Sequence, residues 1–290
     1  MNGQLRAGFI GLGAMGYWMA WHLAERGFLT TVWNRTTEKS IAFARNKNVI
    51  PAASSVELAE QVDVILLCVS ADDDVLQLVR TIQPHLRPGQ IVIDFSTVSR
   101  ETALTTCELI RATGAECLDA PVTGGVEGAR NATLAIMVGG NALTLDRVHA
   151  LLATISNRIV HMGDVGMGQS AKAVNQVLCA GINEAVTEAL AFGEHLGLSM
   201  DKLIDILSGG AAGNWFLDKR GHTMTRGTFE PGFKLRLHHK DLRICQSMAD
   251  QLGTALPLTD TTEAHYRELM AAGHGEEDIS ALYRLKRRSP

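Results

Sequence analysis

A glycine-rich hexapeptide near the N-terminus constrains the fold of this chain more than any other segment. It follows an apolar run at 5–10 and opens a helical pattern at 15–26. Its residues are Gly11, Leu12, Gly13, Ala14, Met15 and Gly16. In a G-x-G-x-x-G turn of this kind the first glycine permits the tight turn, the second lets the backbone approach a pyrophosphate, and the third lets helix pack on strand. The segment predicts the start of a dinucleotide-binding βαβ unit.

Strand-like and helix-like segments alternate through the first half of the chain, which is typical of repeated βαβ units. The run Val62–Val69 is apolar almost throughout, as in a parallel strand that is buried on both faces. Other strand-like runs lie at 30–33, 91–94, 116–120, 133–138 and 159–162. These segments predict a parallel sheet with helices, in an α/β Rossmann-type domain at residues 1–164.

The pattern changes after Gly168, where helix-like segments replace the strands. Residues 169–195 place small apolar side chains three or four positions apart, and this spacing predicts one long helix. Helical patterns also cover 201–207, 238–251, 259–272 and 278–285. We therefore predict a second, all-helical domain at residues 165–290.

The composition is that of an ordinary globular protein. The 290 residues are 46% hydrophobic and 20% charged, with a net charge of −4 and a mean hydropathy of +0.06. We expect no nucleic-acid partner, because the only basic cluster, at 286–288, is a short tail that we expect to be solvated. No apolar run reaches the roughly 18 residues of a membrane span, and the N-terminus lacks a signal-peptide pattern. The five cysteines show no C-x-x-C spacing, so we expect free thiols and a cytoplasmic protein.

The end of the second predicted strand indicates which dinucleotide binds. A site that selects NAD needs an acid about 20 residues beyond the glycines, to bond the ribose 2′-hydroxyl. This chain has Asn34, Arg35 and Thr36 there, and no acid before Glu38. The Arg35 guanidinium can hold a 2′-phosphate through two hydrogen bonds, to which the Asn34 and Thr36 side chains can add. The sequence favours NADP, with NAD as the weaker alternative.

Three further segments suit a reaction site. Residues 119–125 follow a predicted strand, and their last two, Gly124 and Gly125, can expose backbone amides to an anion. Lys172 and Asn175 share one face near the start of the long helix, and residues 240–242 (Lys-Asp-Leu) open a later helical segment. A lysine suits carbonyl reduction, because its ammonium can both stabilise and protonate the alkoxide that hydride addition creates.

These motifs, in this order and spacing, resemble the β-hydroxyacid dehydrogenases. The matching segments are FIGLGAMG, DAPVTGG, G-x-G-x-x-x-K-x-x-N and KDL, and the resemblance runs from Gly8 to the region of Leu282. The family includes 3-hydroxyisobutyrate dehydrogenases, tartronate semialdehyde reductases and glyoxylate/succinic semialdehyde reductases. The resemblance implies a Rossmann-type domain, a long interdomain helix, and an all-helical domain that commonly forms dimers or tetramers.

The resemblance also implies a role for each matching residue. Lys172 corresponds to the catalytic lysine, Asn175 to an asparagine that holds the substrate, and Thr123, with the two glycines that follow it, to the loop that binds the substrate carboxylate. Lys240 corresponds to a lysine where cofactor and substrate meet. Three more residues correspond to positions beside the cofactor: Val69, Ser70 and Thr97.

The chain departs from the family pattern at three positions. His22 stands where many members have asparagine, Thr123 where serine is commoner, and Gln176 where a second asparagine often follows the first. The last two departures weaken any transfer of substrate identity. The segments 34–36 and 240–243 resemble those of the NADPH-using glyoxylate/succinic semialdehyde reductases.

The expected substrate is a small hydroxy or oxo acid. Lys172 and Lys240, with Arg236 or His239, would make the site positive within an acidic chain and so concentrate small anions. The donors suit a carboxylate, a sulfonate or a phosphonate, so the sequence leaves the anion open, together with the direction of reaction. Two alternatives are an imine reductase of the same fold and a non-catalytic NADP-binding sensor. Retention of the lysine argues against both.

No metal is expected. His238 and His239 are adjacent, so on a helix they point about 100° apart and cannot chelate one ion together. The run Asp72–Asp74 precedes a helical segment, where N-terminal capping and compensation of the helix dipole explain it.

Overall fold

The computed structural model describes residues 5–287 and divides into two compact units, Met1–Lys172 and Ala173–Pro290. We call them the sheet unit and the helical unit. The boundary predicted after residue 164 precedes helix α8 (Met167–His195), whereas the division between the units falls inside this helix. Helix α8 is therefore shared between the units.

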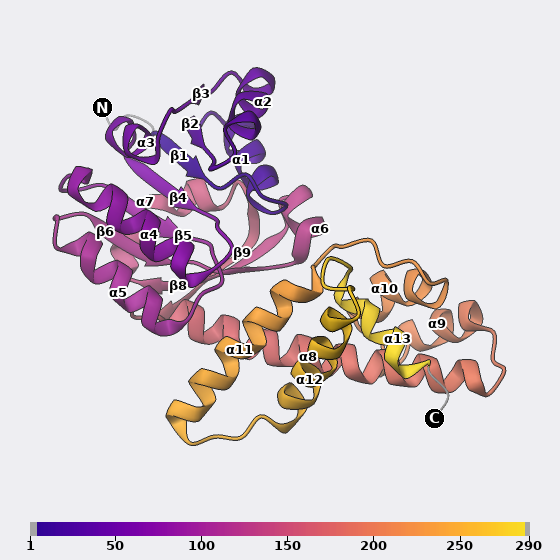
Figure 1. Cartoon of the computed structure of the whole chain (residues 1–290). Helices are drawn as coiled ribbons and strands as arrows, with labels where there is room; N and C mark the ends of the chain where they lie inside the picture. The colour runs from indigo at the N-terminus through magenta and orange to yellow at the C-terminus, as the bar shows by residue number, and fades with distance from the viewer. Residues whose placement is uncertain (1–4, 288–290) are drawn as a thin grey trace. The chain divides into compact units, whose positions relative to one another are not determined.

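The sheet unit is built around one β-sheet (Figure 1). In residues 5–287 this sheet has nine strands, in the order β3-β2-β1-β4-β5-β6-β8-β7, with β9 paired to β8. The strands are β1 (Ala7–Ile10), β2 (Leu29–Trp33), β3 (Ile50–Pro51), β4 (Val64–Leu67), β5 (Ile91–Asp94), β6 (Glu116–Asp119), β7 (Val122–Thr123), β8 (Leu134–Gly140) and β9 (Ser156–Gly163). The first six in this order run parallel, which is the strand order of dinucleotide-binding folds.

The alternating sequence pattern led us to expect a sheet that is parallel throughout. The structure departs from this expectation at one strand. Strand β8 pairs antiparallel with both β6 and β7. Only the short helix α6 (Gly125–Arg130) lies between β7 and β8. Parallel neighbours need a longer crossover of about a dozen residues or more, so this short connection reverses the chain direction instead.

Two apolar layers lie between the sheet and its helices. Successive strand residues point to opposite faces, so Phe9 packs into one layer and Ile10 into the other. The Phe9 layer is covered by α1 (Gly16–Glu25), α2 (Thr37–Lys47), α6 and α7 (Ala142–Leu152), and the Ile10 layer by α3 (Ser55–Gln61), α4 (Asp72–Ile82) and α5 (Arg100–Arg111). A short 3-10 helix, η1 (Gln83–His85), follows α4. Each buried aliphatic or aromatic side chain stabilises the fold by about 1.5–3 kcal/mol, and these layers hold the strand ends in place.

The expectation that all five cysteines are free thiols is wrong for two of them. Cys107 in α5 and Cys117 in β6 form a disulfide, with their Cα atoms 5.4 Å apart. The other three cysteines are not disulfide-bonded. Because α5 leads directly into β6, the crossover brings Cys107 and Cys117 side by side across a separation of ten residues. Spacing rules for short motifs do not reveal such a pairing.

The helical unit contains the rest of α8 and a set of shorter helices around an apolar core. Leu190, Leu242 and Tyr266 are among its buried side chains. The helices are α9 (Met200–Ser208), α10 (Trp215–Thr225), α11 (Leu235–Leu252), α12 (Pro257–Ala271), the 3-10 helix η2 (Ile279–Leu282) and α13 (Tyr283–Lys286). The predicted all-helical domain is confirmed.

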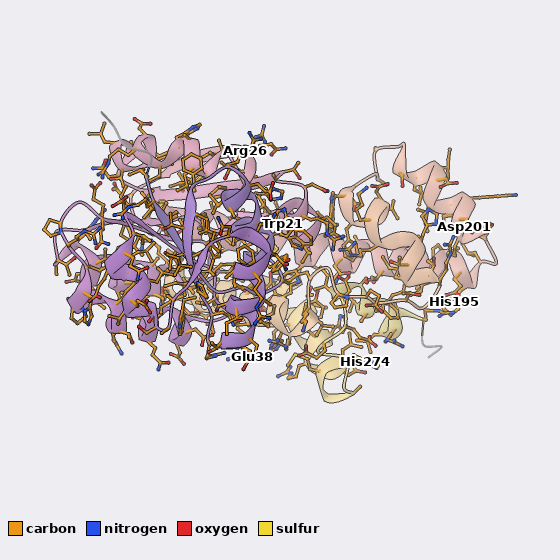
Figure 2. The ribbon with its side chains drawn as sticks, turned by 90° about the horizontal axis from the view of Figure 1, so that it is seen from above. Trp21, Arg26, Glu38, His195, Asp201 and His274 are labelled. Atoms are coloured by element: carbon orange, nitrogen blue, oxygen red, sulfur yellow. A yellow bond between two sulfur atoms is a disulfide. The ribbon has the colours of Figure 1, made fainter. Side chains whose placement is uncertain are left out.

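Two helix ends can be compared with the bounds that the sequence predicted. Helix α8 ends at His195, and Gly197 follows with a φ of 74°, a conformation that glycine adopts readily. Figure 2 shows His195 at this end and Asp201 in the first turn of α9. Helix α11 begins at Leu235, earlier than predicted, so Lys240 lies in its second turn rather than at its start.

The basic cluster at the C-terminal end is not simply solvated. Lys286 pairs with Glu184 at 2.8 Å, and Arg287 donates two hydrogen bonds to Glu194, each of 2.7 Å. These pairs tie the last described residues to α8. Arg288, the third residue of the cluster, lies outside the described residues.

Candidate active site

The glycine hexapeptide forms the turn between β1 and α1. Gly11 has a φ of 101°, and a Cβ there would overlap the carbonyl oxygen of Cys68. A Cβ at Gly16 would overlap the carbonyl oxygen of Gly11. By contrast, a Cβ at Gly13 would meet no heavy atom within 4 Å. Gly11 and Gly16 thus serve packing, whereas Gly13 leaves open space where the backbone can approach a ligand phosphate.

The three residues after β2 have different surroundings. Asn34 Oδ1 accepts a hydrogen bond from the Leu12 amide at 2.8 Å, and its Nδ2 donates to the Thr36 carbonyl oxygen at 3.1 Å. This side chain therefore holds the glycine loop against the end of β2, a contact that the sequence did not indicate. The Arg35 side chain is 83% exposed and pairs with Asp74 at 3.0 Å. Exposed pairs contribute about 0–1 kcal/mol, so Arg35 can exchange Asp74 for a ligand phosphate at little cost.

The loops after β4 and β5 are held by hydrogen bonds to their backbones. The Val69 amide donates to Ser96 Oγ at 2.9 Å. Gln169 of α8 spans the second loop: its Nε2 donates to the Ser96 carbonyl oxygen at 2.8 Å, and its Oε1 accepts from the Val98 amide at 3.2 Å. The three residues predicted to lie beside the cofactor are in these loops: Val69, Ser70 and Thr97.

Two buried aspartates end the neighbouring strands β5 and β6. Asp94 accepts a hydrogen bond from the Ser96 amide at 2.9 Å, and burial raises its pKa to about 7. Asp119 accepts from the amides of Gly166 at 2.7 Å and Gln169 at 2.9 Å. Burial raises the pKa of Asp119 as well, although these amides oppose the shift. Sequence reasoning assigned neither aspartate a role, although a charged residue at the end of an apolar strand was the available signal.

The Thr123–Gly125 loop joins β7 to α6. Gly124 and Gly125 have φ values of 124° and 65°, which residues with a side chain rarely adopt. Their conformations turn the chain from strand into helix and place both residues at the start of α6. That their amides bind a substrate anion stays a prediction.

Helix α8 starts in close contact with β6. A Cβ at Gly168 would lie 2.7 Å from the Asp119 carbonyl oxygen, so only glycine allows this approach. Lys172 follows one turn later and is 8% exposed. Lysine is rarely buried to this degree, because removing an ammonium from water is costly. This burial distinguishes Lys172 from an ordinary solvated lysine near a helix start.

Asn175 and Lys240, predicted on separate segments, are linked within the helical unit. Asn175 Nδ2 donates to Gln176 Oε1 at 2.7 Å, and Gln176 Nε2 donates to Asp241 Oδ2 at 2.6 Å. Lys240 Nζ lies 3.0 Å from Asp241 Oδ1. The sequence marked Gln176 only as a departure from the family pattern, and it gave Asp241 no role. Which side chains of α8 and α11 face each other cannot be read from either helix alone.

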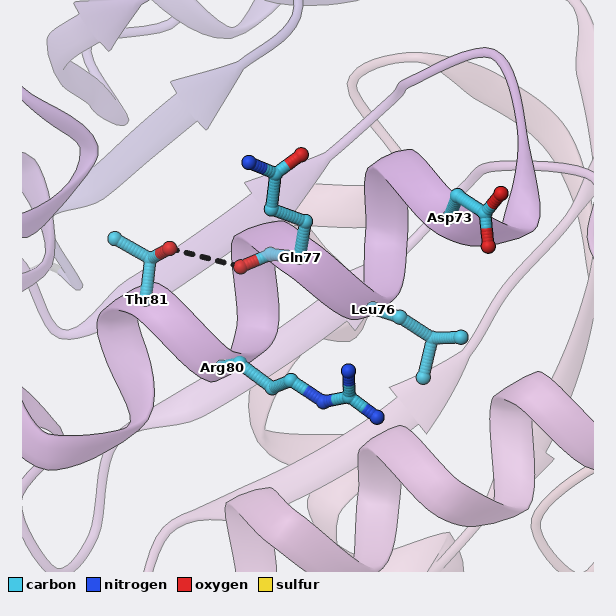
Figure 3. A pocket seen from close by; sticks show the side chains of 5 residues that line it. All are labelled: Asp73, Leu76, Gln77, Arg80 and Thr81. Carbon is cyan, nitrogen blue, oxygen red and sulfur yellow. Dashed lines mark hydrogen bonds between the residues drawn. The ribbon is translucent and has the colours of Figure 1, made fainter.

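An open pocket on α4 does not belong to this site. Figure 3 shows its lining, in which the Thr81 hydroxyl donates to the Gln77 carbonyl oxygen at 2.8 Å. The lining residues all come from α4: Asp73, Leu76, Gln77, Arg80 and Thr81. None of the predicted site residues is among them, so we assign this pocket no function.

The structure gives the acidic run at the start of α4 a packing role. Asp72 accepts hydrogen bonds from the Ser99 amide and the Thr102 hydroxyl, both of 2.8 Å. Its side chain therefore holds the start of α5, whereas α4 itself has no side-chain cap. All three aspartates lie in the first turn of α4, where they also suit the helix dipole.

Two further searches covered the described part of the chain. Between residues 5 and 287, no three His, Cys, Asp or Glu side chains are grouped as a metal site. Over the same residues, none of the helices combines the length and the apolar character needed to cross a membrane.

Comparison with known proteins covers nearly the whole chain. Residues 6–163 match the model of the NAD binding domain of 6-phosphogluconate dehydrogenase. Residues 166–286 match the model described as NAD-binding of NADP-dependent 3-hydroxyisobutyrate dehydrogenase.

Individual relatives agree with these models. The chain is 35% identical over 286 residues to 2-hydroxy-3-oxopropionate reductase of Escherichia coli (strain K12), covering 96% of each protein. The structure of 3-hydroxyisobutyrate dehydrogenase with L-serine, from Mycobacterium tuberculosis, matches with a TM-score of 0.88 and 30% identity, over 99% of this chain and 100% of that one. An imine reductase of Myxococcus stipitatus in complex with NADP+ has a TM-score of 0.66 and 22% identity, over 96% of this chain and 99% of that one. At that identity the last match shows a shared fold alone.

Proposed function

The chain belongs to the β-hydroxyacid dehydrogenases, a family of NAD(P)-dependent oxidoreductases, and we propose that it interconverts small anionic hydroxy and oxo acids with NADP. The substrate classes are 3-hydroxy acids, semialdehydes and glyoxylate. The observation that carries the proposal is Lys172, a lysine only 8% exposed and one turn beyond the glycine that packs against β6.

The glycine loop and Arg35 support NADP as the cofactor. The open space at Gly13 fits a pyrophosphate at the start of α1, and the exposed Arg35 guanidinium fits a 2′-phosphate at the end of β2. Glu38 is the first acid after this strand, so the end of β2 lacks the acid with which NAD-selective sites bind the ribose. The nicotinamide, when bound, supplies or takes up the hydride.

The side chains of this protein handle the proton and the anion. In the reducing direction Lys172 donates a proton to the carbonyl oxygen as negative charge develops there, and in the oxidising direction it accepts the hydroxyl proton. Asn175 and Lys240 hold the substrate, and the Thr123–Gly125 loop binds its anionic group. Gln169 fixes the backbone on both sides of Thr97 and so holds the loop that lies beside the cofactor.

We also propose that the protein self-associates, as a homodimer or homotetramer. Helix α8 exposes apolar side chains at every fourth position, with Val174 63%, Leu178 61% and Ile182 37% exposed. A contiguous apolar stripe on a helix supports burial against another protein surface.

The test compares acids with their neutral esters. With NADPH as the cofactor, glyoxylate, succinic semialdehyde and tartronate semialdehyde are each measured beside the methyl ester. We expect kcat/KM for the ester to be at least about 100-fold lower, because a site built for an anion is left with unpaired donors. Equal efficiency on acid and ester would contradict the proposal. Reduction of a cyclic imine, with none of the oxo acids turned over, would favour the imine reductase instead.

A further inference from the structure

The carboxylate of Asp241 lies at the centre of a buried polar cluster in the helical unit. Asp241 is 4% exposed and Gln176 is 1% exposed. One carboxylate oxygen lies 3.0 Å from Lys240 Nζ, and the other accepts from Gln176 Nε2 at 2.6 Å. Hydrogen bonds to a charged acceptor are about twice as strong as neutral ones, so this carboxylate fixes both of its partners.

The contacts of Gln176 allow only one orientation of its amide. Its Nε2 faces the Asp241 carboxylate, and its Oε1 faces Asn175 Nδ2 at 2.7 Å. Rotating the amide by half a turn would set an oxygen against the carboxylate and an NH₂ group against an NH₂ group. Both changes are repulsive, so the negative charge of Asp241 sets the direction of the whole chain of hydrogen bonds.

The backbone of Gln176 is held from a second side. Tyr266 OH accepts from Asn183 Nδ2 at 2.8 Å, so its own proton points to His238 Nδ1 at 3.0 Å. Burial raises the pKa of Tyr266 well above its ordinary value, and the hydroxyl therefore keeps this proton. His238 must then carry its proton on Nε2, which donates to the Gln176 carbonyl oxygen at 3.3 Å.

We propose that Gln176 and Asp241 are positioning residues that fix the Asn175 amide and the Lys240 ammonium for substrate binding. The proposal rests on the proposed function, in which Asn175 and Lys240 hold the substrate. Asn175 directs its Nδ2 to Gln176 Oε1 at 2.7 Å and to Cys179 Sγ at 3.5 Å. It therefore offers Oδ1, an acceptor, to a hydroxyl group of the substrate. Without Gln176 the Asn175 amide can turn over and present a donor instead.

The kinetic test replaces Gln176 by an apolar residue of similar length. Gln176→Met should raise KM for tartronate semialdehyde, whose hydroxyl can donate to Asn175 Oδ1, by at least about tenfold while changing kcat less, because it disturbs a group that holds the substrate and leaves Lys172 intact. Thr187→Val is the matched control, since Thr187 is fully buried on the same helix and bonds only to nearby backbone carbonyls. It should leave KM unchanged. A wild-type KM in Gln176→Met would overturn the proposal.

A second variant makes the positioning depend on pH. Gln176→Glu keeps the length and the acceptor for Asn175, but it faces Asp241 with a second carboxyl group. With one proton shared between the two carboxyls the hydrogen bond is restored, and with both ionised they repel. Among the described residues, Lys240 and His238 also face this point. Between about pH 5 and about pH 9, KM of Gln176→Glu relative to wild type should rise at least about tenfold, whereas that of Gln176→Met should stay level. A Gln176→Glu profile parallel to wild type would overturn the proposal.

A spectroscopic comparison tests the same geometry without activity. The side-chain NH₂ signals of Asn175 are identified in ¹H–¹⁵N spectra by their loss in Asn175→Ser. They should shift and exchange faster with water in Gln176→Met and in Asp241→Asn, and they should stay in place in Thr187→Val. Unchanged Asn175 signals in Gln176→Met would refute the positioning. If the wild-type protein turned over none of the oxo acids, the proposed function would fail, and these spectra would still decide the geometry.

Discussion

The two units hold their polar site residues by different means. In the sheet unit, backbone amides hold the buried carboxylates: Asp94 binds the amide of Ser96, and Asp119 binds those of Gly166 and Gln169. In the helical unit, side chains hold one another, as Asp241 does with Gln176 and Lys240. Strand ends and loops expose free amides, whereas a helix interior uses its amides within the helix. A carboxylate buried against a helix interior, such as that of Asp241, therefore binds side chains.

This difference has a practical consequence. Positions in the sheet unit should be sensitive to backbone geometry and tolerant of side-chain exchange, because amides are present whatever the side chain is. Positions in the helical unit should depend on the identity of each partner. Three experiments in the sheet unit sharpen this contrast or break it.

The largest effect is expected in the glycine loop, where two substitutions by the same residue should have opposite outcomes. Gly11→Ala should prevent stable folding, because its Cβ would overlap the Cys68 carbonyl oxygen and its φ of 101° disfavours alanine. Gly13→Ala should fold normally, because its Cβ meets open space, but should bind NADPH at least about tenfold more weakly. Thermal unfolding and calorimetry measure the two effects. Wild-type affinity in Gly13→Ala would show that no phosphate approaches there.

The sheet unit was the easier of the two to predict from sequence. A glycine turn, a continuous apolar strand and strand-helix alternation each leave a local signal, and the parallel strand order follows from them. The antiparallel β8 was missed because it depends on the length of one connection. The Cys107–Cys117 disulfide was missed because it depends on how a helix packs on the next strand.

The helical unit shows where sequence reasoning ends. The spacing of small apolar residues predicted α8, and the family motifs selected Lys172, Asn175 and Lys240. The contacts between helices were out of reach, because register and rotation decide which residues of α8 meet which residues of α11. Gln176 and Asp241 therefore became visible only in the structure. The same reason hid the role of Gln169, whose partners lie in a distant loop.

The second effect concerns the pH dependence of stability that Asp94 causes. Its pKa is about 7 in the folded chain and about 3.9 in an unfolded one. Between these values the folded state binds more protons, so stability falls as pH rises from about 4 to about 7 and then levels off. Asp94→Asn removes this loss. The variant should gain stability relative to wild type by a few kcal/mol over that range, at about 1.4 kcal/mol for each pKa unit.

Tryptophan fluorescence can follow this change in the sheet unit alone. Trp18, Trp21 and Trp33 lie in the sheet unit, so a Trp215→Phe background removes the signal of the helical unit. Unfolding free energies of both proteins are then compared at several pH values. A difference between variant and wild type that stays constant with pH would show that Asp94 does not carry the effect.

The smallest effect concerns Arg35. Its exposed side chain is an exception within the sheet unit, because it is expected to act through its own identity and not through the backbone. We expect wild-type kcat/KM to favour NADPH over NADH by at least about tenfold, since one charge-assisted interaction contributes about 1.5–3 kcal/mol. Arg35→Asp should erase or reverse this preference. Asp74→Asn is the control, because it removes the partner at 3.0 Å and leaves the guanidinium in place, so the preference for NADPH should persist. Equal use of both cofactors by the wild type would show that Arg35 does not select the cofactor.

The most direct measurement follows a deuterium label from the cofactor to the product. NADPH with deuterium in both C4 positions of the nicotinamide is incubated with glyoxylate, succinic semialdehyde or tartronate semialdehyde, and the hydroxy acid is analysed by mass spectrometry. We predict that the wild type places one deuterium on the product carbon, and that Lys172→Ala does so at least about 100-fold more slowly while binding NADPH with unchanged affinity. Lys202→Ala, at an exposed lysine of α9, should match the wild type. Unlabelled product, or full turnover by Lys172→Ala, would contradict the proposed chemistry.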